Sequence, residues 1–166
     1  MKNISVLLFL LITLALNAQN NKTSGLNARQ FHKYWKVESE SPDYKVTFLG
    51  DTVEILSPKG LTLWRKEKMS GKVTIEYDAC VVVEVEGDRL SGLNCFWMAS
   101  DPQYPDNIWK REKWRSGIFL NCYSLQLYYM GYGGNHNSTT RFRRYDGNEA
   151  AITNAKARPA ILKKYT

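Results

Sequence analysis

Apolar and polar side chains alternate along most of this chain with the two-residue period of a half-buried β-strand. Turn residues such as Gly50-Asp51 and Pro58-Lys59-Gly60 separate the alternating runs. We find no window with helical spacing, and residues 100–117, which include two prolines, are expected to form a long loop. The predicted strands are residues 44–48, 52–56, 61–64, 72–86, 93–98, 118–132 and 139–145. This pattern predicts an all-β fold, an antiparallel sandwich or jelly roll.

The first eighteen residues have the parts of a secretory signal peptide. Lys2 supplies a basic start, residues 4–16 are almost wholly apolar, and Ala18 is a small residue at a plausible cleavage point. The apolar run is shorter than the ~20 residues that cross a bilayer. We therefore expect a signal peptide at 1–18, a polar leader at 19–30 and one β-sandwich domain at 31–166, exported to the periplasm or the extracellular space without a membrane span in the mature chain.

Composition limits the classes of partner, metal and cofactor that this protein could bind. The 166 residues amount to one domain, and a formal net charge of +7 favours an anionic partner. Export makes nucleic acid a poor candidate. Three cysteines and two histidines are too few for a zinc cluster, so we expect no metal and no cofactor. Cys80, Cys95 and Cys122 lie in apolar runs and are expected to be small buried hydrophobes, with one disulfide and one free thiol as the alternative.

Three sequence blocks carry a resemblance to a known family. They are residues 62–64 with 71–78, residues 93–101, and residues 128–135 running into 139–145. Together they resemble the YesU-like family of secreted concanavalin A-type β-sandwich proteins, over residues 31–166. The resemblance implies a concanavalin A-like jelly roll and an association with enzymes that degrade acidic polysaccharides. Such relatives continue well past Thr166, where a further strand is just beginning, so we expect the chain to be truncated at its C-terminus relative to them.

A basic strand near the C-terminus offers the clearest candidate chemistry. In a strand over residues 139–145, Arg141, Arg143 and Tyr145 share one face, and Phe142 is expected to point towards the core. The planar guanidinium group binds carboxylates with two hydrogen bonds, which suits a uronate chain. The alternative is a glycine turn followed by an ordinary solvated edge strand.

β-Elimination on a uronate requires a group that neutralises the carboxylate, a base and an acid. Arg141 and Arg143 are assigned to neutralisation, and Asn135 to an assisting hydrogen bond. The proton transfer is assigned to His136 or to a tyrosine. The tyrosines in question are Tyr128, Tyr132 and Tyr145.

Two other functions stay open. Glu76 and Asp78 share a face of the predicted strand and could serve a glycoside hydrolase, although Cys80 stands where a third carboxylate would be expected. A non-catalytic binding module could use Trp109 for stacking on a sugar ring. The sequence thus predicts a secreted protein that binds or acts on an acidic polysaccharide or oligosaccharide. A lyase is the favoured enzyme, a binding module is the alternative, and hydrolysis ranks lower.

Overall fold

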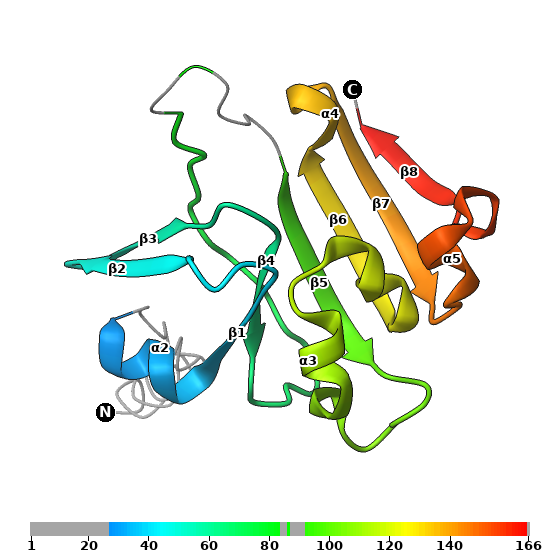
Figure 1. Ribbon diagram of the computed structural model, residues 1–166, viewed down its shortest axis with the longest axis horizontal. Helices are drawn as coiled ribbons and strands as arrows, with labels where there is room; N and C mark the ends of the chain where they lie inside the picture. Colours follow the sequence, from blue (N-terminus) through cyan, green and yellow to red (C-terminus); the bar gives the residue numbers. More distant parts are fainter. Residues whose placement is uncertain (1–26, 84–85, 87–91, 166) are drawn as a thin grey trace, which may run out of the picture.

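The computed structural model describes residues 27–83, 86 and 92–165 (Figure 1). The predicted signal peptide and most of the predicted leader lie outside the described residues. The strands are β1 (Trp35–Ser39), β2 (Lys45–Leu49), β3 (Thr52–Leu56), β4 (Leu61–Arg65), β5 (Leu93–Ser100), β6 (Gln126–Gly133), β7 (Thr139–Asp146) and β8 (Ile161–Tyr165). The helical segments are α2 (Ala28–Tyr34), η1 (Ile108–Arg111), α3 (Glu112–Arg115), η2 (Phe119–Ser124), α4 (Gly134–Asn137), α5 (Ala150–Thr153) and η3 (Ala155–Ala157).

All strand pairs in the described residues are antiparallel, which confirms the predicted all-β class. Strands β1 and β4 form one pair, and β2 and β3 form a hairpin with its turn at Gly50-Asp51, as predicted. The main sheet has four strands in the order β5-β6-β7-β8. Figure 1 shows α3, α5 and the short helices beside them on one side of this sheet.

The register of the main sheet defines its two faces. Residues directly opposite each other in an antiparallel pair point to the same face. The inner face carries Asn94, Phe96, Leu127, Tyr129, Gly131, Arg141, Arg143 and Tyr145. The outer face carries Cys95, Trp97, Tyr128, Met130, Phe142 and Arg144.

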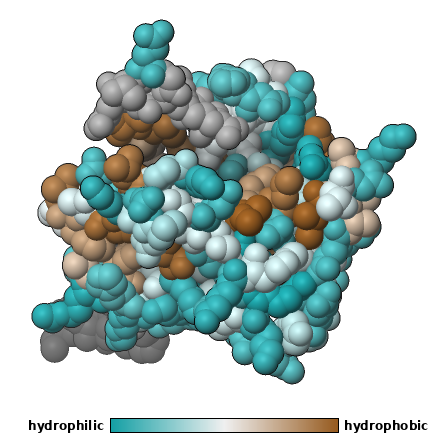
Figure 2. Space-filling model, viewed as in Figure 1, coloured by the Kyte–Doolittle hydropathy of each residue, from teal (hydrophilic) through white to brown (hydrophobic). Residues whose placement is uncertain are grey.

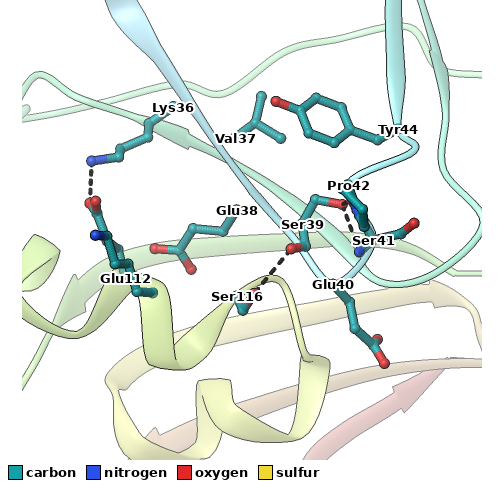
Figure 3. Close-up of a pocket in the computed structure, with 11 residues that line it drawn as sticks. Lys36, Val37, Glu38, Ser39, Glu40, Ser41, Pro42, Tyr44, Glu112 and Ser116 are labelled. Carbon is teal, nitrogen blue, oxygen red and sulfur yellow. Dashed lines mark hydrogen bonds and ion pairs between the residues drawn. The ribbon is translucent and has the colours of Figure 1, made fainter.

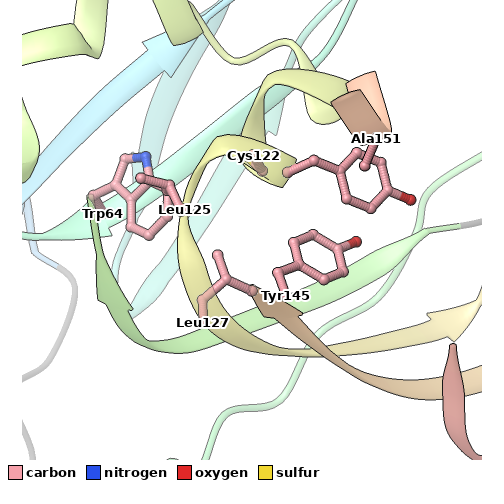
Figure 4. Packing of buried hydrophobic residues seen from close by; sticks show 7 residues of the cluster. Trp64, Cys122, Leu125, Leu127, Tyr145 and Ala151 are labelled. Carbon is pink, nitrogen blue, oxygen red and sulfur yellow. The ribbon is translucent and has the colours of Figure 1, made fainter. Parts of the chain in front are cut away.

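The hydrophobic core lies against one end of the inner face (Figure 4). Its buried members are Trp64, Cys122, Tyr123, Leu125, Leu127, Tyr145 and Ala151. Trp64 of β4 stacks on Phe96 of β5, with 5.8 Å between the ring centroids, so the β1–β4 pair also packs on this face. The inner face is therefore the one that folding covers.

A chain of ion pairs holds the helical segments in place. Arg115 of α3 is fully buried and bonds to Glu38 of β1, with its Nη2 2.6 Å from Oε1. Arg115 Nη1 also lies 4.0 Å from buried Asp101, just after β5. Asp101 in turn accepts two hydrogen bonds from Arg111, which pairs with Glu149 before α5. These charges join three distant parts of the chain over the core.

Several segments differ from the sequence prediction. Residues 72–83 run extended but pair with no described strand (Figure 1). An alternating sequence favours an extended backbone, but a β-strand also needs a neighbouring strand for its hydrogen bonds. Residues 119–124 form the short helix η2 instead of a strand, and this helix buries Cys122, Tyr123 and Ser124. The predicted loop at 100–117 contains η1 and α3.

Helix α2 begins inside the segment predicted as a polar leader. The Asn27 side chain accepts a hydrogen bond from the Gln30 backbone N–H at 3.0 Å and caps the first turn. Phe31 is buried, and its ring lies 5.4 Å from that of Phe48 in β2. This contact fixes the helix against the β2–β3 hairpin.

The visible surface is mostly polar, with apolar patches on the left around β2 and β3 (Figure 2). Exposed Leu49, Ile55 and Leu56 belong to this hairpin. Within the described ranges, none of the helices has the length and apolar character needed to cross a membrane.

Candidate functional site

The inner face of the main sheet continues beyond the core as a group of polar side chains. Asn94 of β5, Tyr129 of β6, and Arg141 and Arg143 of β7 form this group, which we call the arginine–tyrosine cluster. Asn94 is exposed, and the other three are half-buried. The cluster therefore combines a solvent-accessible edge with partly desolvated charges.

Cross-strand register brings the cluster together. One row across the sheet is Asn94, Gly131 and Arg141, and the next row is Phe96, Tyr129 and Arg143. Arg141 and Arg143 are two residues apart on one strand, which separates their Cα atoms by about 7 Å. Both guanidinium groups thus rise from the same face beside the tyrosine.

Gly131 determines where the tyrosine lies. A Cβ atom at position 131 would overlap the Tyr129 phenol oxygen, so the ring occupies space that only glycine leaves free. Tyr129 Oη donates a hydrogen bond to Asn94 Oδ1 at 3.0 Å. The phenol is therefore held between two strands, over the backbone of its own strand.

Burial and charge act in opposite directions on this phenol. Burial raises the pKa of Tyr129, and the positive charges of Arg143 and Arg141 offset part of that rise. The net direction is upward, so the hydroxyl is protonated at neutral pH. It is suited to donate a proton or a hydrogen bond.

Arg141 and Arg143 have hydrogen-bond donors and positive charge that no described residue fully uses. Arg143 Nη1 donates a 3.4 Å hydrogen bond to Tyr123 Oη. Among the described residues, neither Arg141 nor Arg143 forms an ion pair with a carboxylate. The Nε atoms of both are buried and meet no acceptor there. An arriving carboxylate would meet positive charge that the described chain does not neutralise.

The structure places the predicted residues of β7 only partly as expected. Arg141, Arg143 and Tyr145 do share a face, as strand geometry required. Tyr145, however, is only 1% exposed and belongs to the core, so it does not line the cluster. The expectation that Phe142 points to the core is wrong, because the core covers the opposite face.

The other predicted tyrosines and the hairpin residues lie elsewhere. Tyr128 and Tyr132 point to the outer face. Asn135 and His136 sit exposed at the tip of the β6–β7 hairpin, in left-handed conformations with φ of 52° and 56°. No hydrogen bond or ion pair in the described part of the chain joins His136 to Arg141.

Glu76, Asp78 and Trp109 also lie apart from the cluster. Glu76 and Asp78 are exposed in the extended segment, where they line a shallow hollow with Ile75 and Tyr77. Trp109 is half-buried in η1 and packs against the core. The described residues contain no group of three or more His, Cys, Asp or Glu side chains that could hold a metal ion.

Sequence reasoning missed Asn94 and Tyr129. Both lie on strands that it predicted or overlapped, yet their place beside the arginines depends on register across β5, β6 and β7. Gly131 is the one local signal, because a glycine two residues after a strand tyrosine leaves room for a ring to lie across it.

A second polar hollow lies between β1 and α3 (Figure 3). Most of its charged groups already have partners: Lys36 pairs with Glu112, Glu38 with Arg115, and Glu40 accepts a hydrogen bond from the Gly60 N–H at 3.3 Å, whereas Lys113 has no ion pair within the described residues. This largely paired lining offers less to a charged ligand than the arginine–tyrosine cluster does.

Comparison with known proteins adds a family. Residues 55–166 match a protein family described as a domain of unknown function (DUF6250). The chain belongs to this family. The DUF6250 region contains the entire main sheet and all four residues of the arginine–tyrosine cluster. No curated protein and no solved structure matches the chain.

Proposed function

We propose that this DUF6250 protein is a secreted carbohydrate-active protein that binds an acidic, uronate-containing polysaccharide at the arginine–tyrosine cluster. The observation that carries the proposal is the pair of same-face guanidinium groups, Arg141 and Arg143, without a described carboxylate partner. The signal-peptide pattern of residues 1–18 supports secretion. We also propose that the antiparallel β fold is of the concanavalin A-like jelly-roll type and related to YesU-like proteins.

The chemistry of binding follows from the side chains. A guanidinium group makes charge-assisted hydrogen bonds to a carboxylate, and these are stronger than bonds between neutral groups. Partial burial of Arg141 and Arg143 strengthens their field because less water screens it. Tyr129 and Asn94 add hydroxyl and amide groups that can bond to sugar hydroxyls. A linear uronate fits this combination of charge and polar groups.

A lyase reaction is the favoured catalytic form of the proposal. The arginines would neutralise the uronate carboxylate and make the adjacent C–H more acidic, water at the exposed edge of the cluster would accept that proton, and protonated Tyr129 would give its proton to the departing oxygen and regain one from solvent. Hydrolysis is less favoured because it uses two neighbouring carboxylates. The paired inner-face positions of β5, β6 and β7 carry none.

A non-catalytic binding module is the second candidate. It is favoured by the position of His136, which lies at the hairpin tip and has no bond to the cluster within the described chain. A binding module needs the arginines and polar side chains but no base. The two candidates share a site and differ only in whether the bound glycan undergoes elimination, with loss of a C–H proton and cleavage of the glycosidic bond.

Binding and elimination can be tested in one experiment. The purified protein is titrated with polygalacturonate and with the same polymer after its carboxylates are methyl-esterified, while ultraviolet absorbance records unsaturated uronate. We expect binding to the free acid only. Arg141→Ala and Arg143→Ala should each weaken it by roughly ten-fold or more, the equivalent of about 1.5–3 kcal/mol for a charged hydrogen bond.

Arg144→Ala is the matched control, because Arg144 lies next in the chain but on the outer face. Absorbance that rises with time identifies a lyase, and binding without absorbance identifies a module. Equal loss of binding in the Arg144 and Arg141 variants would refute the cluster as the site.

A further inference from the structure

We propose that residues 75–79 close onto the free edge of β5 as a fifth strand of the main sheet, and that this strand brings the Asp78 carboxylate to the inner face as a further glycan-binding group of the arginine–tyrosine cluster. The structure describes these residues in an open position, extended and without a paired strand. The role of Asp78 rests on the proposed function, whereas the strand pairing does not.

Strand β5 ends the main sheet on one side. Within the described residues it pairs with β6 alone, so the backbone N–H and C=O groups along its other edge have no strand to bond to. Figure 1 shows the extended segment 72–83 on the side of β5 away from β6. An open edge beside an extended segment of the same chain is a template for one more antiparallel strand.

The segment has one apolar face and one polar face. Residues 72–79 alternate strictly between polar and apolar side chains. Val73, Ile75 and Tyr77 are 46%, 48% and 58% exposed. The even-numbered positions are all polar, and they include Glu76 and Asp78. In a strand the two sets point to opposite faces of the sheet.

One side-chain contact shows which face each set would join. The Tyr77 hydroxyl donates a hydrogen bond to the Cys95 sulfur, and Cys95 lies on the outer face. A strand that keeps Tyr77 on the outer face puts Ile75 there as well, opposite Trp97. Asp78 then points to the inner face, and a register shift of two residues leaves this assignment unchanged.

The position of a turn supports this register. In an antiparallel hairpin that pairs Tyr77 with Cys95, the residue halfway between them is Glu86. Glu86 lies in a turn of the described chain. The chain therefore turns at the place that the pairing requires, and consecutive strands joined in this way need no crossover connection.

Pairing brings Asp78 into a polar row of the cluster. Asn94 is opposite Asp78 in this register, and the row continues through Gly131 to Arg141. Three strand spacings of ~4.8 Å place the Asp78 and Arg141 Cα atoms about 14 Å apart. The Tyr129 phenol lies over Gly131, between the two ends. Side chains stand roughly perpendicular to a sheet, so the two opposite charges mark the ends of the row and do not pair with each other.

Glu76 does not share this role. It falls in the next row, opposite Phe96, whose ring packs against those of Trp64 and Tyr129 at centroid distances of 5.8 Å and 5.5 Å. Aromatic rings thus fill the space beside Glu76. The closed strand adds one carboxylate to the polar row, which is fewer than the pair that glycoside hydrolysis uses.

A carboxylate at this end of the row suits the hydroxyl groups of a sugar. Ionised Asp78 accepts hydrogen bonds, and hydroxyl groups are the donors that a glycan offers. The negative charge also repels a uronate carboxylate, which therefore lies at the Arg141 end. Asp78 and Arg141 together orient the bound sugar. A glycan that contacts both residues shifts the segment towards its closed position.

Disulfide trapping in the full chain tests the strand. Tyr77→Cys is combined with Cys80→Ser and oxidised, and mass spectrometry of peptides measures the bond between positions 77 and 95. A disulfide needs Cα atoms within about 7 Å, so a short cysteine at position 77 reaches Cys95 only when the strands pair. Glu76→Cys with Cys80→Ser is the matched control, because position 76 faces away from Cys95. We expect at least ten-fold more cross-link in the first variant, and more again with polygalacturonate present.

Hydrogen exchange of the unmodified protein measures the same pairing without any substitution. Backbone amides of residues 75–79 should exchange at least ten-fold more slowly than those of the loop residues 66–70, because the strand protects them. Circular dichroism checks that the cysteine variants stay folded, which the exposed positions 76 and 77 favour.

The glycan contact is tested by Asp78→Ala. We expect polygalacturonate binding to weaken by roughly ten-fold, the loss that follows from removing a charged hydrogen bond, while the urea midpoint stays near that of the parent. Asp51→Ala removes an exposed carboxylate at the β2–β3 turn and should leave binding unchanged.

The strand and the role of Asp78 can fail separately. Cross-linking that is absent at position 77, or equal at positions 76 and 77, overturns the strand, and so does fast exchange of residues 75–79. A cross-linked strand with full binding in Asp78→Ala overturns the role of Asp78, while Arg141→Ala still decides the proposed function. A parent protein that does not bind polygalacturonate overturns the proposed function together with the role of Asp78, and the cross-link then decides the strand alone.

Discussion

Arg115 and Glu38 form a buried ion pair across 77 positions of the chain, with Arg115 Nη2 2.6 Å from Glu38 Oε1 and side-chain exposures of 0% and 3%. The bond ties α3 to β1, and Asp101 and Arg111 extend it towards α5. A charge taken so far from water must keep its partner. The pair therefore fixes how the helical segments sit over the sheet.

We predict that Glu38→Gln destabilises the fold by about 3–5 kcal/mol, because it leaves the Arg115 charge buried without its main partner. Urea unfolding measures the change. The paired substitution Glu38→Gln with Arg115→Met should cost less than Glu38→Gln alone. Glu67→Gln, which breaks the exposed pair with Arg65, should cost less than about 1 kcal/mol. Equal costs for Glu38→Gln and Glu67→Gln would contradict the prediction.

Gly131→Ala should disturb the arginine–tyrosine cluster more than the fold. The new methyl group would overlap the Tyr129 phenol, which can swing away because it is the free end of a side chain. We expect uronate binding to fall about as much as in Tyr129→Phe, with stability lowered by about 1 kcal/mol. Gly134→Ala, at the hairpin end, is the control. Titration and thermal unfolding of the three variants give the comparison.

The two faces of β7 predict different costs for two aromatic substitutions. Tyr145→Ala removes a ring that is 1% exposed in the core and should cost about 3–5 kcal/mol. Phe142→Ala removes a half-buried ring from the outer face and should cost clearly less. Urea denaturation of the two variants gives the comparison. A larger cost for Phe142→Ala would mean that the outer face is the true core.

The three cysteines should react with a thiol reagent at very different rates. Burial raises the pKa of Cys122 to about 12, so at pH 8 roughly one thiol in ten thousand is a thiolate. Burial also raises the pKa of Cys95, whereas Cys80 is exposed. We expect iodoacetamide to modify Cys80 first and Cys122 only after unfolding, as read by mass spectrometry of peptides. Rapid labelling of Cys122 in the folded protein would show that its burial is wrong.

The prediction that the cysteines are small buried hydrophobes is confirmed for one of them and wrong for another. Cys122 is the small buried hydrophobe that the apolar pattern predicted. For Cys80 that interpretation is wrong, because the segment that carries it does not pair into a sheet and stays exposed. The same apolar pattern therefore gave opposite burial, because η2 packs against the core and the segment that carries Cys80 does not.

Local sequence determined where most strands lie. The runs at 44–48, 52–56, 61–64, 93–98 and 139–145 appear as β2, β3, β4, β5 and β7, since a two-residue period and turn residues act over a few positions. The same period placed Arg141 and Arg143 on one face without any knowledge of the rest of the chain.

Tertiary structure decided which face became the inside and which residues joined the arginines. Both faces of the main sheet carry aromatic side chains, so alternation could separate Tyr145 from Phe142 but could not tell which of them would be covered. Only the packing of η2, α5 and β4 settled that. Tyr129 and Asn94 reach the arginines through register across three strands, and register is set by long-range hydrogen bonding and packing that no short stretch of sequence contains.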